Sequence, residues 1–137
     1  MESTVSHTFR KKERMVSRKL MEQLFEGGKA RSASAYPVRA VYMKVDRQSL
    51  GVPVQVLITV SKRHFKRAVK RNRVKRQIRE AYRLNKQILT DRVEQTSEDL
   101  SLAVAFIWLA DRLYETAEIE DSVKSLLHRI SERVGDK

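Results

Sequence analysis

Apolar residues recur along the chain at two different spacings, and these spacings predict an alternation of helices and strands. A short helix is expected after Ser17, a residue type that often caps helix N-termini, and the pair Gly27-Gly28 ends it. One side of this helix is apolar and carries Leu20, Met21, Leu24 and Phe25. The small, polar stretch Lys29–Ala35 predicts a loop.

Two strands are expected next. Residues Tyr36–Val45 alternate imperfectly, so that one face of the first strand carries Tyr36, Val38, Ala40 and Tyr42. Asp46–Gly51 predicts a turn, and Val52–Val60 is rich in β-branched residues, which favours a second strand.

The rest of the chain, after Val60, predicts two longer helices with one buried strand between them in sequence. Arg67–Leu89 has helical spacing, and its apolar arc holds Val74, Ile78, Ala81, Tyr82, Ile88 and Leu89. Thr90–Asp99 predicts an acidic loop, and the almost continuously apolar Leu100–Leu109 predicts a strand buried on both faces. Thr116 is expected to cap a final helix whose first turns are acidic, as suits the positive end of a helix dipole.

These elements predict an α+β fold, namely a small two-layer α/β sandwich. The expected order is α-β-β-α-β-α, with room for a third short strand early in the chain. The length of 137 residues suits one domain, which we expect over residues 14–134. Residues 1–13 are expected to form a flexible basic arm and residues 135–137 a short tail.

The charge is concentrated in one segment of the chain. The sequence contains 29 Lys and Arg against 17 Asp and Glu, a net charge of +12. Residues 62–86 hold twelve basic residues and one acidic residue, Glu80, whereas residues 87–137 are net acidic. Such a segment repels itself unless a polyanion relieves the repulsion, so a merely solvated helix face is disfavoured. Arginine outnumbers lysine in it, which favours a structured nucleic acid over an anionic lipid surface.

The sequence offers no convincing protein active site. It lacks cysteine, and its three histidines have no partners at metal-ligand spacing. Ser61–His64 is better interpreted as a turn beside phosphate-binding residues than as a nucleophile with a base. The longest apolar run, Leu102–Ala110, is far shorter than the roughly 20 residues that span a bilayer. We therefore expect a cytoplasmic protein without a membrane partner, and the lack of cysteine suits a reducing compartment.

Two assignments stay open at this level. Asn72 either serves a capping or turn role near the helix start or contacts the ligand directly. Phe25, Tyr36 and Tyr42 either stack on unpaired bases or belong to the core. Trp108, inside a buried strand, is expected in the core.

The basic segment resembles the signature of bacterial ribonuclease P protein subunits. Lys66–Arg83 reads KRAVKRNRVKRQIREAYR, in which Arg71-Asn72-Arg73 matches the arginine–asparagine–arginine helix of that family. Thr59–Lys62 matches the end of the strand that leads into this helix. Leu24-Phe25 followed by Gly28 resembles the family's first helix and its stop.

The resemblance implies a fold like the second domain of ribosomal protein S5, with a left-handed βαβ crossover through the basic helix, contrary to the usual hand. It implies a subunit of ribonuclease P, an endoribonuclease that removes the 5′ leader of precursor tRNA by phosphodiester hydrolysis. The catalytic RNA is expected to perform the chemistry and to hold most of the Mg²⁺, with no catalytic or metal-binding residue from the protein. The alternative is a non-catalytic protein that binds structured RNA, such as a ribosomal or assembly factor.

The partners implied are the catalytic RNA and the single-stranded 5′ leader, with no obligate protein partner. By the resemblance, the residues expected to contact RNA are Ser61, Lys62, Arg63, Lys66, Arg67, Lys70, Arg71, Asn72, Arg73, Lys75, Arg76 and Arg79. A leader cleft between the first helix and the sheet is expected to be lined by Phe25, Met21, Tyr36 and Tyr42. Met21 stands where the family often has an aromatic residue, so we expect weaker stacking there, or stacking by one of the two tyrosines.

Overall fold

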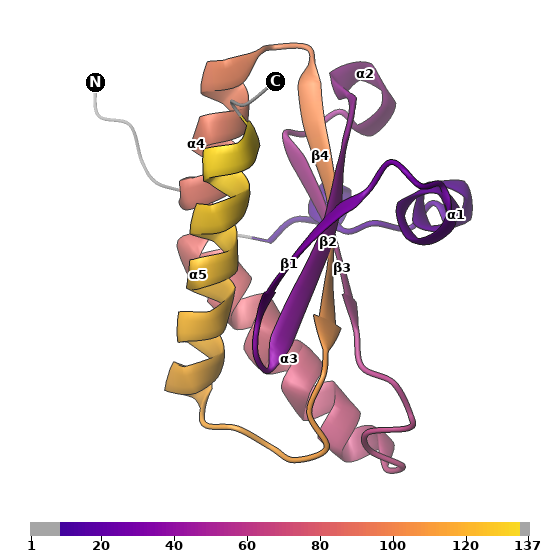
Figure 1. The fold of residues 1–137 in the computed structure, drawn as a ribbon, viewed down its shortest axis with the longest axis vertical. Helices are drawn as coiled ribbons and strands as arrows, with labels where there is room; N and C mark the ends of the chain where they lie inside the picture. The colour runs from indigo at the N-terminus through magenta and orange to yellow at the C-terminus, as the bar shows by residue number, and fades with distance from the viewer. Residues whose placement is uncertain (1–8, 135–137) are drawn as a thin grey trace.

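Four strands form one mixed sheet in the order β1-β2-β4-β3 (Figure 1). The computed structural model describes residues 9–134, so the first eight residues of the predicted arm and the predicted tail at 135–137 lie outside the described residues. The strands are β1 (Arg31–Ala35), β2 (Val38–Asp46), β3 (Val54–Thr59) and β4 (Leu100–Trp108). β2 is antiparallel to β1 and to β4, whereas β3 runs parallel to β4. The mixed α+β class is confirmed.

The three longer helices cover one face of this sheet, and two shorter ones lie against the other face (Figure 1). The large layer consists of α3 (Ala68–Asn85), α4 (Gln87–Thr96) and α5 (Thr116–Val134). The opposite face carries α1 (Arg18–Glu26) and the one-turn α2 (Arg47–Leu50). The expected sandwich therefore describes the main core, and α1 adds a partial third layer.

The central strand explains the apolar run of the sequence. β4 lies between β2 and β3, and all its residues from Ser101 to Phe106 are buried. On β2, Val38, Ala40 and Tyr42 face the three-helix layer, as their alternation predicts, while Val41 faces α1. Tyr36 precedes the strand and lies in the turn that joins β1 to β2, with a cis bond to Pro37. Its assignment to a strand face was wrong.

The expected loop at Lys29–Ala35 is wrong, because Arg31–Ala35 forms the edge strand β1. Its small polar residues have weak strand propensity, but backbone pairing with β2, for example Ala33 opposite Ala40, supplies what the side chains do not. The outer edge of β1 is covered by α5. Arg129 Nη1 donates to the carbonyl of Ser34, and Arg133 Nη1 donates to the carbonyl of Ser32 at 3.2 Å.

Helical structure continues beyond the predicted end of the basic helix, so the expected loop at Thr90–Asp99 is also wrong. α4 extends to Thr96, because Leu89 and Val93 continue the buried stripe. A break at Lys86 separates α3 from α4. The two helices connect the parallel strands β3 and β4, which makes a βαβ unit, and its left hand stays a prediction.

Three smaller expectations need correction or refinement. Ser17 caps α1 as predicted, accepting a hydrogen bond from the amide of Leu20 at 3.2 Å. Thr116 does not cap α5 but is its first residue, and its hydroxyl accepts a hydrogen bond from Gln77 Nε2 at 3.0 Å. The predicted turn before β3 contains the short helix α2, which is followed by Gly51 with φ of +74°.

The described end of the predicted basic arm contacts the folded domain. The ring of Phe9 meets that of Tyr82 edge-on with centroids 5.6 Å apart. Residues 11–13 form a 3-10 turn, and the amide of Met15 donates to the carbonyl of Val56 at 2.9 Å. Gln55 Nε2 donates to the carbonyl of Lys12 at 3.0 Å. This segment therefore runs along the outer edge of β3.

Candidate nucleic-acid interface

The basic segment, residues 62–86, forms the loop after β3 and the whole of α3. Val74, Ile78, Ala81 and Tyr82 bury one side of α3 against the core, as their spacing predicts. The opposite side is exposed and basic. We call this the α3 surface, and it comprises Lys66, Arg67, Lys70, Asn72, Arg73 and Arg76. Lys75 and Arg79 flank it and are half-buried.

The charge at the start of α3 opposes the usual arrangement of helix ends. Acidic residues are favoured in a first turn because the free amides there carry partial positive charge. The first turn of α3 contains no acidic residue, and its N-cap, Arg67, makes no side-chain capping bond. Basic side chains and the free amides of the first turn therefore lie together at the N-terminus of α3. Their mutual repulsion destabilises the helix by itself, and their combined positive charge favours a bound anion.

Arg71 holds the loop that precedes the helix. Its Nη1 donates to the carbonyls of Phe65 and Lys66, both at 2.8 Å, while the Phe65 side chain is buried. Within the loop, Ser61 Oγ accepts from the amide of Arg63 at 3.1 Å. Among the predicted RNA-contacting residues, Arg71 and Ser61 thus also shape the backbone that presents the others.

Two contacts fix the loop and α3 against the segment that follows β4. His64 Nδ1 lies 2.6 Å from Asp111 Oδ1, and Gln77 bonds to Thr116 as described above. The amino-acid sequence predicts no partner for His64, since Asp111 lies 47 positions along the chain. No local spacing signals such a pair.

An ion pair within α3 lies near the C-terminal end of the helix. Glu80 accepts from Arg83 Nε at 3.1 Å and from Arg83 Nη2. This hydrogen bonding lowers the pKa of Glu80 and raises the pKa of Arg83. The one carboxylate of α3 is therefore engaged by a neighbouring arginine and does not face the first turns.

A second candidate surface lies between α1 and the sheet. A hollow of about 260 Å³ is lined in part by Phe25, Arg39, Val41 and Ile107, and we call it the α1 hollow. Phe25 is 47% exposed there, and Met21 packs on the apolar cluster beneath α1. Arg39 was not among the predicted site residues, because a single outward-facing arginine in a strand carries no distinguishing signal.

The two tyrosines expected in this cleft lie elsewhere, and that part of the expectation was wrong. Tyr42 is buried on the opposite face of the sheet, where its hydroxyl accepts a hydrogen bond from Arg133 at 2.9 Å. Tyr36 is exposed, and its ring packs edge-on against that of Tyr114 with centroids 6.3 Å apart. Strand alternation and the β1–β2 turn direct both away from α1. Of the four residues predicted for the cleft, Phe25 lines the α1 hollow, Met21 packs beneath α1 without lining it, and the two tyrosines lie away from α1.

Residues 9–134 contain no group of three or more His, Cys, Asp or Glu side chains arranged to hold a metal ion. No helix in this range is long and apolar enough to cross a membrane.

Comparison with known proteins gives consistent results. The profile of the protein family described as Ribonuclease P matches residues 9–131. A ribonuclease P protein component of Porphyromonas gingivalis is 36% identical over 134 residues, covering 98% of this chain and 94% of that protein. One of Chlorobaculum tepidum is 41% identical over 100 residues, covering 66% and 65%. The solved structure of Staphylococcus aureus RNase P protein superposes with a TM-score of 0.62 at 22% identity, covering 86% of this chain and 94% of that one.

Proposed function

The chain belongs to the ribonuclease P protein family, and on that premise we propose that the α3 surface binds the catalytic RNA of ribonuclease P. We further propose that the α1 hollow receives the single-stranded 5′ leader of precursor tRNA. As a member of this family, the chain is a protein component of an endoribonuclease that acts in tRNA 5′ processing. The comparisons do not favour the alternative of a ribosomal or assembly factor.

The observation that carries the first assignment is the unopposed positive charge at the start of α3. Arg67, Lys70 and Arg73 are exposed around free helix amides with no carboxylate in the first turn. Guanidinium groups bind phosphate oxygens bidentately, so a backbone of regularly spaced phosphates satisfies several of them at once. Asn72 adds a donor and an acceptor, which suits either a base edge or a sugar hydroxyl.

The leader assignment rests on the pairing of an aromatic face with a cation. In the α1 hollow, Phe25 offers a partly exposed ring and Arg39 an exposed guanidinium. Stacking on aromatic rings is tolerant of sequence and requires unpaired bases, so this surface suits a single strand. We propose that the protein positions both RNAs while the catalytic RNA, with Mg²⁺ bound mainly to it, hydrolyses the phosphodiester bond. We place this activity in the cytoplasm.

Reconstitution tests this proposal. The full chain, its cognate catalytic RNA and precursor tRNA are mixed with Mg²⁺, and products are resolved on a denaturing gel. We expect cleavage at the mature 5′ end in the complete mixture and none with the protein alone. Cleavage by the protein without RNA would overturn the assignment of roles. RNA that copurifies with the chain is sequenced in parallel, and recovery of ribosomal RNA alone would overturn the assignment of partner.

A further inference from the structure

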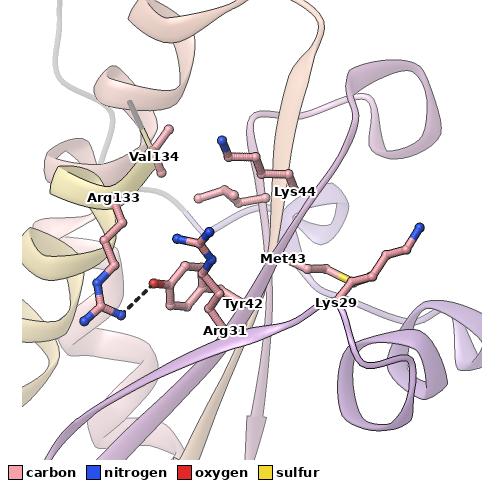
Figure 2. A pocket seen from close by; sticks show the side chains of 8 residues that line it. Lys29, Arg31, Tyr42, Met43, Lys44, Arg133 and Val134 are labelled. Carbon is pink, nitrogen blue, oxygen red and sulfur yellow. Dashed lines mark hydrogen bonds between the residues drawn. The ribbon is translucent and has the colours of Figure 1, made fainter. Parts of the chain in front are cut away.

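A basic cavity of about 290 Å³ lies at the C-terminal end of α5, beside β1 and β2 (Figure 2). The side chains that line it include four cations, Lys29, Arg31, Lys44 and Arg133, and no carboxylate. The cavity is far from the α3 surface, since α3 begins and α5 ends at opposite ends of the helical layer (Figure 1). Its lining comes from both faces of the sheet, because Tyr42 and Leu102 belong to the core under the helical layer and Met43 packs on the α1 side. The cavity shares no lining residue with the α1 hollow.

The floor of the cavity is apolar. Tyr42, Leu102 and Val134 line it and are each at most 5% exposed. A charge held against such a floor is shielded less by water than one on an open surface, so its attraction for an anion is stronger. The volume is near the lower end of the roughly 300–1,000 Å³ typical of small-molecule sites, which suits a small anion.

One of the four cations is held in place by its neighbours. Arg133 Nη1 donates to the hydroxyl of Tyr42 at 2.9 Å and to the carbonyl of Ser32 at 3.2 Å. Hydrogen bonding to Tyr42 raises the pKa of Arg133, with a smaller contribution from the charge of Glu132. Both bonds use Nη1, so within the described residues Nε and Nη2 have no partner and stay available to a ligand.

A second guanidinium is placed on the same face by strand pairing. Arg31 lies opposite Tyr42 in the β1–β2 register, so both side chains project toward α5. Figure 2 shows the Arg31 side chain beside the Tyr42 ring, with Arg133 across from it and Lys44 above. Arg31 is exposed and makes no hydrogen bond or ion pair with the residues that the structure describes.

We propose that this cavity binds a phosphate group. Two guanidinium groups and the Lys44 ammonium group beside an apolar floor match the charge and the several acceptor oxygens of a phosphoryl group better than the two oxygens of a carboxylate. Lys29 extends from the other side of the cavity, toward α1 (Figure 2), and is not part of this group. The source we favour is a backbone phosphate of the bound RNA, and this part alone rests on the proposed function. The other source is a free phosphate ion, and the experiment distinguishes the two.

The first arm measures phosphate itself. Inorganic phosphate is titrated into the full chain, and backbone amide NMR shifts are followed with sodium acetate at equal ionic strength as the reference. We expect saturable shifts around Arg31, Tyr42 and Arg133 with phosphate only. Arg31→Gln should weaken phosphate binding about tenfold or more, while Lys124→Gln, the same charge change on the exposed side of α5, should not. Equal responses to acetate and phosphate, or no local shift, would overturn the proposal.

The second arm identifies the source. Affinity of the chain for the catalytic RNA is measured at several salt concentrations for wild type, Arg31→Gln and Lys124→Gln, with Arg73→Gln on the α3 surface in parallel. If the phosphate belongs to RNA, Arg31→Gln lowers the slope of log affinity against log salt by about 0.9, and Lys124→Gln leaves it unchanged. An unchanged slope in Arg31→Gln alone assigns the site to free phosphate and overturns the RNA source. If Arg73→Gln also leaves the slope unchanged, the proposed function is overturned. The phosphate titration of the first arm still decides whether the cavity binds phosphate.

Discussion

Glu13 and Lys86 form an ion pair, with Lys86 Nζ 2.9 Å from Glu13 Oε2, although 73 positions separate them in the chain. Only 8% of the Lys86 side chain and 13% of the Glu13 side chain is exposed. The pair connects the segment before α1 to the junction of α3 and α4. It therefore fixes the N-terminal segment to the same helical layer that presents the α3 surface.

Breaking this pair should destabilise the fold. Removing one partner of a nearly buried pair leaves the other charge without compensation, so Glu13→Gln should cost about 3 kcal/mol in the free energy of unfolding. The measurement is urea denaturation, with Glu94→Gln on the exposed side of α4 as the matched control. The double variant Glu13→Gln/Lys86→Met should recover part of the loss. A single-variant loss no larger than that of the control would contradict the pair's structural role.

Single substitutions on the α3 surface should change the salt dependence of RNA binding. Arg73 and Arg76 are exposed and are expected to meet phosphates, so Arg73→Ala or Arg76→Ala should lower RNA affinity. Each should also reduce the slope of log affinity against log salt by about one unit per lost phosphate contact. Filter binding at several salt concentrations measures this, with Lys124→Ala as the control. A lower affinity with an unchanged slope would mean that these side chains do not contact phosphate.

The α1 hollow should distinguish precursor from mature tRNA. Phe25→Ala should weaken binding of the reconstituted holoenzyme to precursor tRNA by about fivefold or more, because a stacking contact with a leader base is lost. Binding of mature tRNA should hardly change. Tyr36→Ala serves as the matched aromatic control, since Tyr36 lies in the β1–β2 turn against Tyr114. Equal weakening of both RNAs by Phe25→Ala would remove this residue from the leader site.

Arg71 should stabilise the loop that precedes α3 even without RNA. Arg71→Ala removes both hydrogen bonds to the carbonyls of Phe65 and Lys66 and should lower stability by about 1.5 kcal/mol. Amide hydrogen exchange of residues 63–66 should accelerate more than that of β4, because the loss is local. Arg73→Ala is the control, as its side chain makes no such bond within the described residues. Uniform acceleration in both variants would contradict a specific role of Arg71 in the loop.

The Glu80–Arg83 contact gives a pH-dependent prediction. Carboxyl NMR titration should place the pKa of Glu80 below its ordinary value of 4.5, because Arg83 donates to the charged form. Arg83→Gln should return this pKa toward 4.5, while Arg76→Gln should not. A group whose pKa is lowered by folding adds stability above its unfolded pKa and loses it as the pH falls. The contribution of this exposed pair should therefore disappear in acid, and an unshifted Glu80 in wild type would refute it.

Sequence periodicity predicted the elements whose side chains face a core. The arc of Val74, Ile78 and Tyr82 and the buried run of β4 follow from hydrophobic spacing alone. β1 was missed because Arg31–Ala35 owes its conformation to backbone pairing with β2, which side-chain chemistry does not report. The extension of α4 was signalled only by Val93, a single apolar residue among polar ones.

The exposed basic surface was predictable because its residues are continuous in the chain. The basic residues of α3 are neighbours in sequence, so their charge and helical spacing predict that they share one exposed side. Their contact with RNA stays a prediction. The basic cavity combines Arg31 and Lys44 with Arg133, which lies about a hundred positions away and meets them only once α5 packs against β1. Tyr36 and Tyr42 were wrongly predicted to line the cleft beside α1 for the same reason. Which face of the sheet lies against α1 depends on tertiary packing, which local sequence spacing does not reveal.

Both outer edges of the sheet are occupied by groups of the chain itself. The carbonyls of Ser32 and Ser34 on β1 accept from arginines of α5, and the carbonyl of Val56 on β3 accepts from the amide of Met15. An unpaired strand edge invites backbone pairing with an extended peptide or a second copy of the same chain. With these carbonyls engaged, the two edges offer fewer unpaired backbone groups to an added strand, so the fold itself opposes edge-to-edge association.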